Sequence, residues 1–143
     1  MMLKHEFVEF IPDELKEGML YVSLIYKTAL HNCACGCGME VVTPISPTDW
    51  KITFDGESIS LYPSIGNWSF PCRSHYWIKS SKIVWDVSWS DNKIAASRTF
   101  DGQGKRDFYN SKTDDRPTVN LEAESESRRG RLARLWNWVG RAF

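Results

Sequence analysis

The sequence predicts a small, mainly β protein in which antiparallel hairpins surround a zinc site and a C-terminal amphipathic helix follows. Three observations predict it: strand-forming residues alternate around turn pairs, thiols cluster, and an apolar stripe lies near the chain's end. The 143 residues are 42% hydrophobic, which suffices for one compact core. We expect a zinc-binding β domain over residues 1–100, a polar flexible linker over residues 101–127 and a basic amphipathic helix over residues 128–143.

The clearest hairpin is predicted around Asp55-Gly56, a pair that tolerates positive φ. Apolar residues alternate with polar ones over residues 50–54, and the alternation resumes at Ile59 and Leu61. A one-residue slip would expose every apolar side chain of this pattern, so the register is well specified.

Further strands are expected from β-branched and aromatic residues. Residues 19–30 read as a strand that leads into the cysteines, and residues 39–42 as a short strand closed by Pro44. Residues 63–71 read as a loop because they begin and end with proline. A second hairpin, over residues 76–89, is expected to turn at Ser80-Ser81.

Composition excludes some classes of partner and some cellular locations. A formal net charge of +0 and a pI near 6.8 argue against nucleic acid as the partner. No apolar stretch approaches the roughly 20 residues that a membrane-spanning helix needs, and the N-terminus lacks the apolar region of a secretory signal. We therefore expect a cytoplasmic protein, in which four cysteines favour metal ligation over disulfides.

The candidate metal ligands come from two distant segments. Three thiols fall within five residues in the first segment, and the second places a thiol three residues before an imidazole. Zinc prefers four such ligands in a tetrahedron, and a thiolate-rich set is typical of a structural site. Five residues compete for four positions: Cys33, Cys35, Cys37, Cys72 and His75. We prefer the set without Cys37, and His31 is an outside sixth candidate.

A catalytic interpretation of the same residues is the main alternative. Cys72 with His75 or His31 would form a thiolate–imidazolium pair, but a spacing of three residues suits a shared metal better. Asp86 and Asp91 are candidate acids, although solvated loop positions explain them more simply. The chain has no phosphate-binding glycine loop, no nucleophile-elbow serine motif and no HExxH pattern. These observations favour a non-catalytic protein.

Two regions are candidate partner-binding sites. Trp68 in the predicted loop either packs over the metal site or lines a groove for a peptide, with Arg73 as the contact for a carboxylate. Near the C-terminus apolar residues recur at helical spacing and form one stripe. Three roles for this stripe compete: docking on its own domain, lying on a membrane surface, or filling a partner's groove. Its short length disfavours the membrane. The stripe residues proposed to bind a partner are Leu132, Leu135, Trp136 and Val139.

The segments Cys33-Ala-Cys35-Gly-Cys37-Gly and Cys72-Arg-Ser-His75-Tyr-Trp77 together resemble a bacterial and phage domain family of unknown function. The likeness covers roughly the first two thirds of the chain. Genes of that family often neighbour bacterial ubiquitin-like conjugation genes, which encode a modifier, activating and conjugating enzymes and a zinc peptidase. The resemblance implies an accessory role in such a pathway or in antiphage defence, with a protein of the pathway as partner.

The sequence thus supports two hypotheses. The first is a zinc-binding adaptor that recognises a protein partner in a ubiquitin-like conjugation or defence system. The alternative is a zinc- or cysteine-dependent peptidase or transferase that acts in the same system. The oligomeric state is not predicted by any of these residues.

Overall fold

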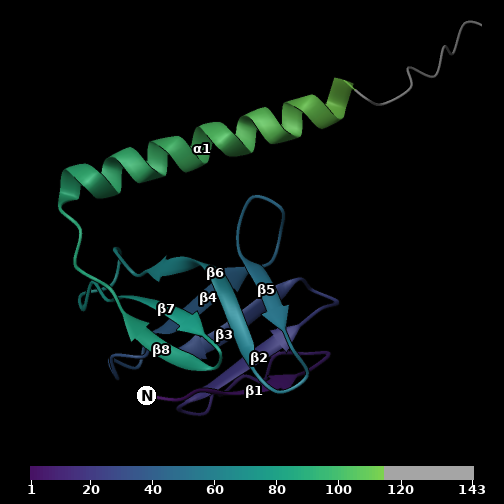
Figure 1. Ribbon diagram of the computed structural model, residues 1–143, viewed down its shortest axis with the longest axis vertical. Helices are drawn as coiled ribbons and strands as arrows, with labels where there is room; N and C mark the ends of the chain where they lie inside the picture. Colours follow the sequence, from purple (N-terminus) through teal and green to yellow (C-terminus); the bar gives the residue numbers. More distant parts are fainter. Residues whose placement is uncertain (115–143) are drawn as a thin grey trace, which may run out of the picture. The chain divides into compact units, whose positions relative to one another are not determined.

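The computed structural model describes residues 1–114. The chain divides into two units, Met1–Phe108 and Tyr109–Phe143, and the strands all belong to the first. Among residues 1–114, eight strands come before one helix (Figure 1). The predicted mainly-β class is confirmed.

The first sheet has the order β1-β2-β3-β4. Its strand β1 pairs in parallel with β2, whereas β2, β3 and β4 pair antiparallel. The predicted strand over residues 19–30 is in fact two strands joined by a turn at residues 24–27. The four strands are β1 (Lys4–Phe7), β2 (Met19–Ser23), β3 (Thr28–Asn32) and β4 (Glu40–Pro44).

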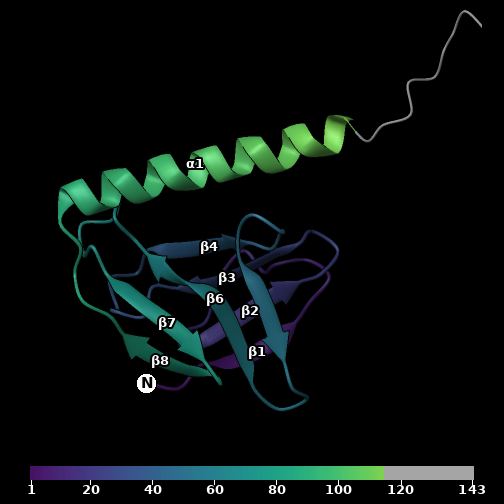
Figure 2. The ribbon, with the colours of Figure 1, turned by 45° about the horizontal axis from the view of Figure 1, so that its top comes forward.

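The second sheet has the order β5-β6-β7-β8 and is antiparallel throughout, as Figure 2 shows from a second side. Both predicted hairpins are confirmed. Asp55 turns the first, because its carboxylate accepts the backbone N–H groups of Glu57 and Ser58. Ser80 and Ser81 turn the second with φ of 46° and 60°. The strands are β5 (Lys51–Phe54), β6 (Ile59–Gly66), β7 (His75–Lys79) and β8 (Lys82–Trp85).

Strand β6 runs further than the sequence predicts. The predicted loop begins at Pro63, but β6 continues through Pro63 to Gly66. A register shift between Leu61 and Ile65 accommodates the proline, and Ile65 again pairs with Tyr76 of β7. This extension carries Ser64 into the sheet.

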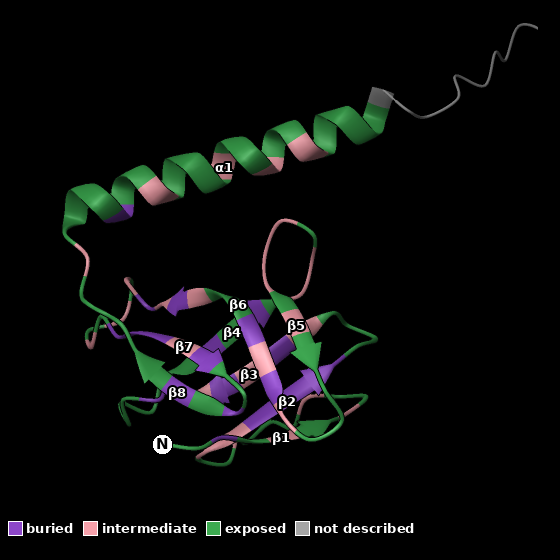
Figure 3. Cartoon of the chain, viewed as in Figure 1, coloured by how far each residue is buried: buried purple, intermediate pink, exposed green. Residues whose placement is uncertain are grey.

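The core contains side chains from both sheets in one cluster. Leu20, Val22 and Val41 come from the first sheet, and Leu61 and Tyr76 come from the second. Buried residues alternate with exposed ones along β4, as expected for a sheet with one covered face. Figure 3 shows this contrast between the buried strand positions in purple and the mostly exposed helix in green.

Helix α1 (Asp91–Asp114) corrects the predicted linker, which was expected to begin at Asp101. Ser90 caps its start, since the Ser90 hydroxyl accepts the Lys93 N–H and the Ser90 carbonyl accepts the Ile94 N–H. The helix is mostly exposed, as its polar composition suggests, but Ile94 is buried and Lys105 is half-buried. Within α1, Asp101 and Lys105 stand at the i, i+4 spacing that stabilises exposed helices.

Two further predictions concern membrane-spanning helices and the C-terminal part of the chain. Among residues 1–114, no helix is long and apolar enough to cross a membrane. The predicted helix over residues 128–143 lies outside the described residues, and so does the remainder of the predicted linker, residues 115–127.

Candidate active site and cysteine cluster

One face of the second sheet carries a polar cluster that combines β6, β7 and the end of β8. Gly66 pairs with His75, and Ser64 lies two residues before Gly66 on β6, as Trp77 lies two residues after His75 on β7. The Asp86 N–H donates to the His75 carbonyl, so Asp86 extends the ladder of β8 beside His75. Because side chains two residues apart share a face, these groups project from the same side of the sheet. The opposite side holds Ile65 and Tyr76 in the core.

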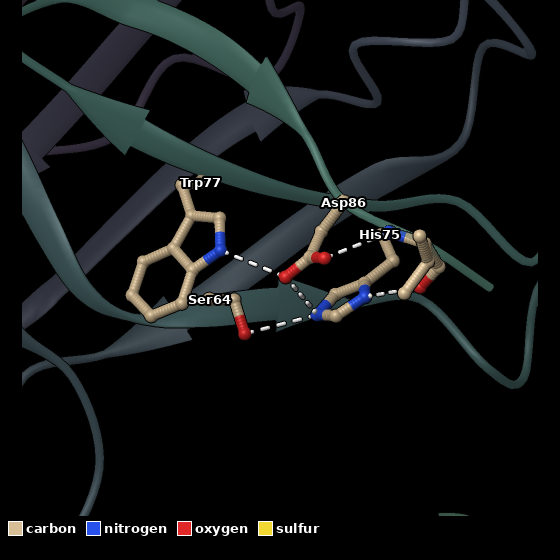
Figure 4. Close-up of polar contacts among 5 residues, drawn as sticks. Ser64, His75, Trp77 and Asp86 are labelled. Atoms are coloured by element: carbon tan, nitrogen blue, oxygen red, sulfur yellow. Dashed lines mark hydrogen bonds and ion pairs between the residues drawn. The ribbon is translucent and has the colours of Figure 1, made fainter. Parts of the chain in front are cut away.

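Ser64 and His75 contact each other directly. The distance between Ser64 Oγ and His75 Nε2 is 3.0 Å (Figure 4). His75 Nδ1 lies 2.9 Å from the carbonyl oxygen of Val87. A carbonyl oxygen only accepts, so Nδ1 carries the ring proton in the neutral imidazole. Nε2 is then free to accept the Ser64 O–H, which is the arrangement of a general base beside a hydroxyl nucleophile.

Asp86 adds a negative charge to this pair without holding the ring. Its Oδ2 lies 3.9 Å from His75 Nε2, and it accepts the Trp77 indole N–H at 2.9 Å (Figure 4). The hydrogen bonds from Trp77 and from the Val87 N–H lower the pKa of the Asp86 carboxyl below its usual range. Asp86 is therefore ionised at neutral pH and stabilises a positive charge on His75.

A cavity of about 360 Å³ opens beside Ser64 and His75. Trp68 and Trp89 stack with ring centres 5.6 Å apart, and both rings contact His75. His75 itself is only 3% exposed, so the aromatic rings shield the imidazole from bulk water. The remaining wall includes Trp50 and, from α1, Ile94.

Charged side chains border the same cavity. Lys105 forms an ion pair with Asp49, and Arg98 donates to the Ser69 hydroxyl. Arg73, predicted as the contact for a partner's carboxylate, forms an exposed ion pair with Asp91 of this chain at 2.6 Å, and its role toward a partner stays a prediction. Trp68 lines the cavity, and its role in binding a partner stays a prediction.

The four cysteines come together at the loops that follow β3 and β6. Their sulfur atoms all lie within 4.8 Å of one another. Cys33 Sγ is 3.4 Å from Cys35 Sγ and 3.9 Å from Cys72 Sγ. Cys37 Sγ completes the group at 3.7 Å from Cys72 Sγ. The cluster brings a loop of each sheet together, because the first three thiols follow β3 of the first sheet and the fourth precedes β7 of the second.

These distances fit a tetrahedral metal site. Four thiolates about 2.3 Å from a zinc ion stand about 3.8 Å apart, and the distances from Cys33 to Cys72 and from Cys37 to Cys72 are close to this value at 3.9 and 3.7 Å. The four thiols could therefore hold a metal ion. His75, preferred over Cys37 from the sequence, is not in this group, because its two ring nitrogens contact Ser64 and Val87. Cys37 occupies the position predicted for the imidazole.

The thiols differ in acidity. Burial raises the pKa of Cys72, but hydrogen bonds with Ser74 and the neighbouring thiols outweigh it and lower the pKa to about 6. Burial raises the pKa of Cys35 to about 12, and hydrogen bonds with Cys37 and Cys33 add to this effect. In the metal-free protein Cys72 is thus the first thiol to ionise among these two.

Buried polar groups connect the cysteine cluster to the sheet that carries His75. Asn67 Nδ2 donates to Ser74 Oγ at 2.9 Å and approaches Cys33 Sγ at 3.6 Å. Ser74 Oγ in turn lies 3.1 Å from Cys33 Sγ. Ser74 immediately precedes His75, so this network joins the cysteine cluster to the start of β7.

Ser64 was missed from the sequence, whereas His75 was assigned to the metal. Pro63 made the segment resemble a loop, and a serine in a loop carries no catalytic signal. The available signal was Ile65, which resumes the apolar alternation of Ile59 and Leu61 after the proline. Four predicted partner-binding residues lie outside the described part of the chain: Leu132, Leu135, Trp136 and Val139.

The comparisons with known proteins bear on the same segment. A family model described as "Bacterial ubiquitination-like system serine protease (BubE)" matches residues 7–86. That range contains all four cysteines, Ser64, His75 and Asp86. No curated protein and no solved structure matches the chain. Since the match covers more than half of the residues, this chain belongs to the BubE family of bacterial ubiquitination-like systems.

Proposed function

We propose that this protein is a serine peptidase that acts on a protein component of a bacterial ubiquitination-like system. The observation that carries the proposal is the contact between Ser64 Oγ and His75 Nε2, with Nδ1 held by the Val87 carbonyl. The description of the family points to the same chemistry. Of the two hypotheses from the sequence, this one is closer to the peptidase, but with serine in place of cysteine or zinc.

The reaction follows from the geometry. Ser64 Oγ attacks the carbonyl carbon of the scissile bond, and its proton passes to His75 Nε2. The imidazolium keeps its Nδ1–H on Val87 O, and the Asp86 carboxylate 3.9 Å away stabilises the new charge. His75 then protonates the leaving amine, which departs and leaves an ester on Ser64. Water, deprotonated by His75, hydrolyses that ester and restores both groups.

In many serine peptidases one aspartate both orients the histidine ring and stabilises its positive charge. Here the Val87 carbonyl and the Asp86 carboxylate share these two tasks. The Val87 carbonyl fixes the tautomer, whereas Asp86 supplies charge without a hydrogen bond to Nδ1. We therefore describe Ser64 and His75 as the catalytic pair and Asp86 as a residue that acts through its charge alone.

We further propose that the cysteine cluster binds one structural zinc ion. All four ligands are thiols, and the sulfur spacing leaves no open coordination position for a reacting water. When bound, the ion would hold the loop before β7 in place. Zinc would thus support His75 indirectly and take no part in the chemistry.

Hydrolysis of p-nitrophenyl esters of short peptides tests the catalytic proposal, because an ester needs less side-chain recognition than an amide. Ser64→Ala should lower the rate by about 100-fold or more, as loss of a nucleophile does in serine peptidases. Ser69→Ala removes a hydroxyl in the neighbouring loop and should hydrolyse like the parent protein. Full activity of Ser64→Ala would refute the proposal, and so would inactivation by iodoacetamide in the zinc-loaded protein.

The non-catalytic adaptor is the second candidate, and exposed aromatic side chains favour it. Phe7 packs on Phe54, and Phe10 packs on Tyr26, yet each of the four rings keeps at least about two fifths of its surface exposed (Phe7, the least exposed, 42%). Such pairs suit a protein partner. Plaque counts on a phage-challenged host distinguish the roles: a peptidase predicts that Ser64→Ala abolishes protection, whereas an adaptor predicts that the same variant protects fully.

A further inference from the structure

The backbone of Ser64 and Gly66 faces away from the neighbouring strand. In an antiparallel ladder, hydrogen-bonded pairs occur at every second residue. The Asn67 N–H donates to the Ser74 carbonyl, so the next bonded pair is Ile65 with Tyr76. The N–H and C=O groups of Ser64 and Gly66 therefore point outward. Strand β5 stops pairing at Tyr62, and no backbone partner faces these groups within residues 1–114.

The edge of β4 is free in the same way. The Cys33 N–H donates to Met39 O and the Ile45 N–H to Lys27 O, which fixes the bonded pairs of the β3–β4 ladder. By this alternation the backbone groups of Glu40 and Val42 point away from β3. The Pro44 carbonyl, next in the outward series, accepts the Trp50 N–H from that side.

Both edges face one cavity. A cavity of about 300 Å³ is lined by Glu40 and Val42 of β4 and by Gly66 of β6. It shares Trp50 and Gly66 with the cavity that contains Ser64 and His75. A chain lying along the β6 edge would thus lead straight to the Ser64 hydroxyl.

We propose that the protein substrate binds here as an extended, unpaired segment that adds a strand to the outward edge of β6, with the edge of β4 as the opposite wall. The unsatisfied N–H and C=O groups of Ser64 and Gly66, two residues apart, match the repeat of an extended chain. The apolar lining, which includes Val42 and Trp50, favours an apolar side chain on the segment. This inference rests on the proposed function, because it presumes that Ser64 is the nucleophile.

A series of peptidyl phosphonates tests it on the intact protein. Acetyl-capped tetra-alanine diphenyl phosphonate bonds covalently to an activated serine, with phenol as the leaving group. In each member of the series one amide N–H is replaced by N–CH₃. Strand addition predicts that methylation at alternate amides slows inactivation by about tenfold, the effect of one lost hydrogen bond, and that the amides between them are little affected. Equal rates across the series would overturn the inference.

Two controls separate this inference from the function on which it rests. A small alkyl fluorophosphonate, which has no peptide chain, should label Ser64 and should not label Ser64→Ala. Failure of that label refutes the nucleophile and the inference with it, whereas labelling without an alternating N-methyl pattern refutes only the bound strand.

A variant tests the contribution of β4. Val42→Pro removes one outward N–H and leaves the β3–β4 hydrogen bonds intact, since Val42 faces away from β3. We expect a lower ratio of the peptidyl phosphonate rate to the small fluorophosphonate rate. An unchanged ratio in this variant would show that β4 does not contact the segment.

Discussion

The two ring nitrogens of His75 have different partners, and this difference defines the chemistry of the site. Nδ1 donates to a backbone carbonyl that no side-chain substitution removes, while Nε2 meets the Ser64 hydroxyl. The Asp86 carboxylate lies 3.9 Å from Nε2, too far for a hydrogen bond, and it accepts hydrogen bonds from Trp77 and from the Val87 N–H instead. The site should therefore depend strongly on His75 and only moderately on Asp86.

Substitutions at these two residues should separate the roles. His75→Ala should slow ester hydrolysis by about a thousandfold, because the proton acceptor is lost. Asp86→Asn should cost about tenfold, since a partly exposed charge 3.9 Å away is screened by water. Rates of acylation for both variants check this order. Equal losses would mean that Asp86 orients the ring after all.

Thiol reactivity provides a pH-dependent test at the same scale. With a pKa of about 6, Cys72 is mainly thiolate at pH 7, and its alkylation rate should rise as the pH increases through that value. Cys35, with a raised pKa, should react slowly under the same conditions. Mass-spectrometric mapping of iodoacetamide adducts in metal-stripped protein measures both rates. Faster modification of Cys35 than of Cys72 would contradict the assignment, and protection of both thiols is expected once metal is restored.

At the scale of elements, local patterns predicted the two hairpins but not the boundaries that make the site. Alternation around Asp55-Gly56 and the Ser80-Ser81 pair was sufficient, because a hairpin is specified by its turn and its apolar face. Strand β6 was cut short in the prediction because Pro63 signals a break, whereas the tertiary pairing of Ile65 with Tyr76 overrides that signal.

The cysteines and α1 are two further cases in which the sequence pattern alone was not sufficient. The clustering of cysteines in the sequence predicted that these loops meet, yet the choice between Cys37 and His75 depends on where β7 begins, which spacing does not reveal. Helix α1 has a polar sequence without a strong apolar face, so its pattern resembled a linker.

The Ser80-Ser81 turn allows a matched pair of substitutions. Both residues have positive φ, a backbone conformation that costs free energy for residues other than glycine. Ser80→Gly should raise the free energy of unfolding by about 0.5–1 kcal/mol, because the strain is relieved. Ser81→Gly relieves the same strain but loses the buried bond from the Ile59 N–H to Ser81 Oγ, so no gain is expected. Urea unfolding measures both; a destabilised Ser80→Gly would contradict this explanation of the turn.

For the whole molecule, the cysteine cluster joins the loops of two sheets whose shared core is small. Cys33 is buried in that core, and Ser74 and Asn67 continue the connection to β7. A metal ion at this point would therefore stabilise the fold and hold the catalytic pair in register at the same time.

Removal of metal should lower stability and reactivity together. Because structural zinc contributes many kcal/mol of folding free energy, a strong chelator should lower Tm by more than about 10 °C. Differential scanning calorimetry with parallel ester hydrolysis measures both effects, and Cys33→Ser should reproduce them without chelator. Elemental analysis should find one zinc per chain. Unchanged melting in the presence of chelator would exclude a structural ion.

The decisive measurement is the position of a covalent label. Protein treated with a fluorophosphonate at neutral pH is digested, and tandem mass spectrometry identifies the modified residue. An adduct on Ser64, absent after denaturation or in His75→Ala, is the expected result, because only the folded contact with His75 activates that hydroxyl. An adduct on another hydroxyl, or none on the folded zinc-loaded protein, would contradict the assignment of Ser64 and His75 as the catalytic pair.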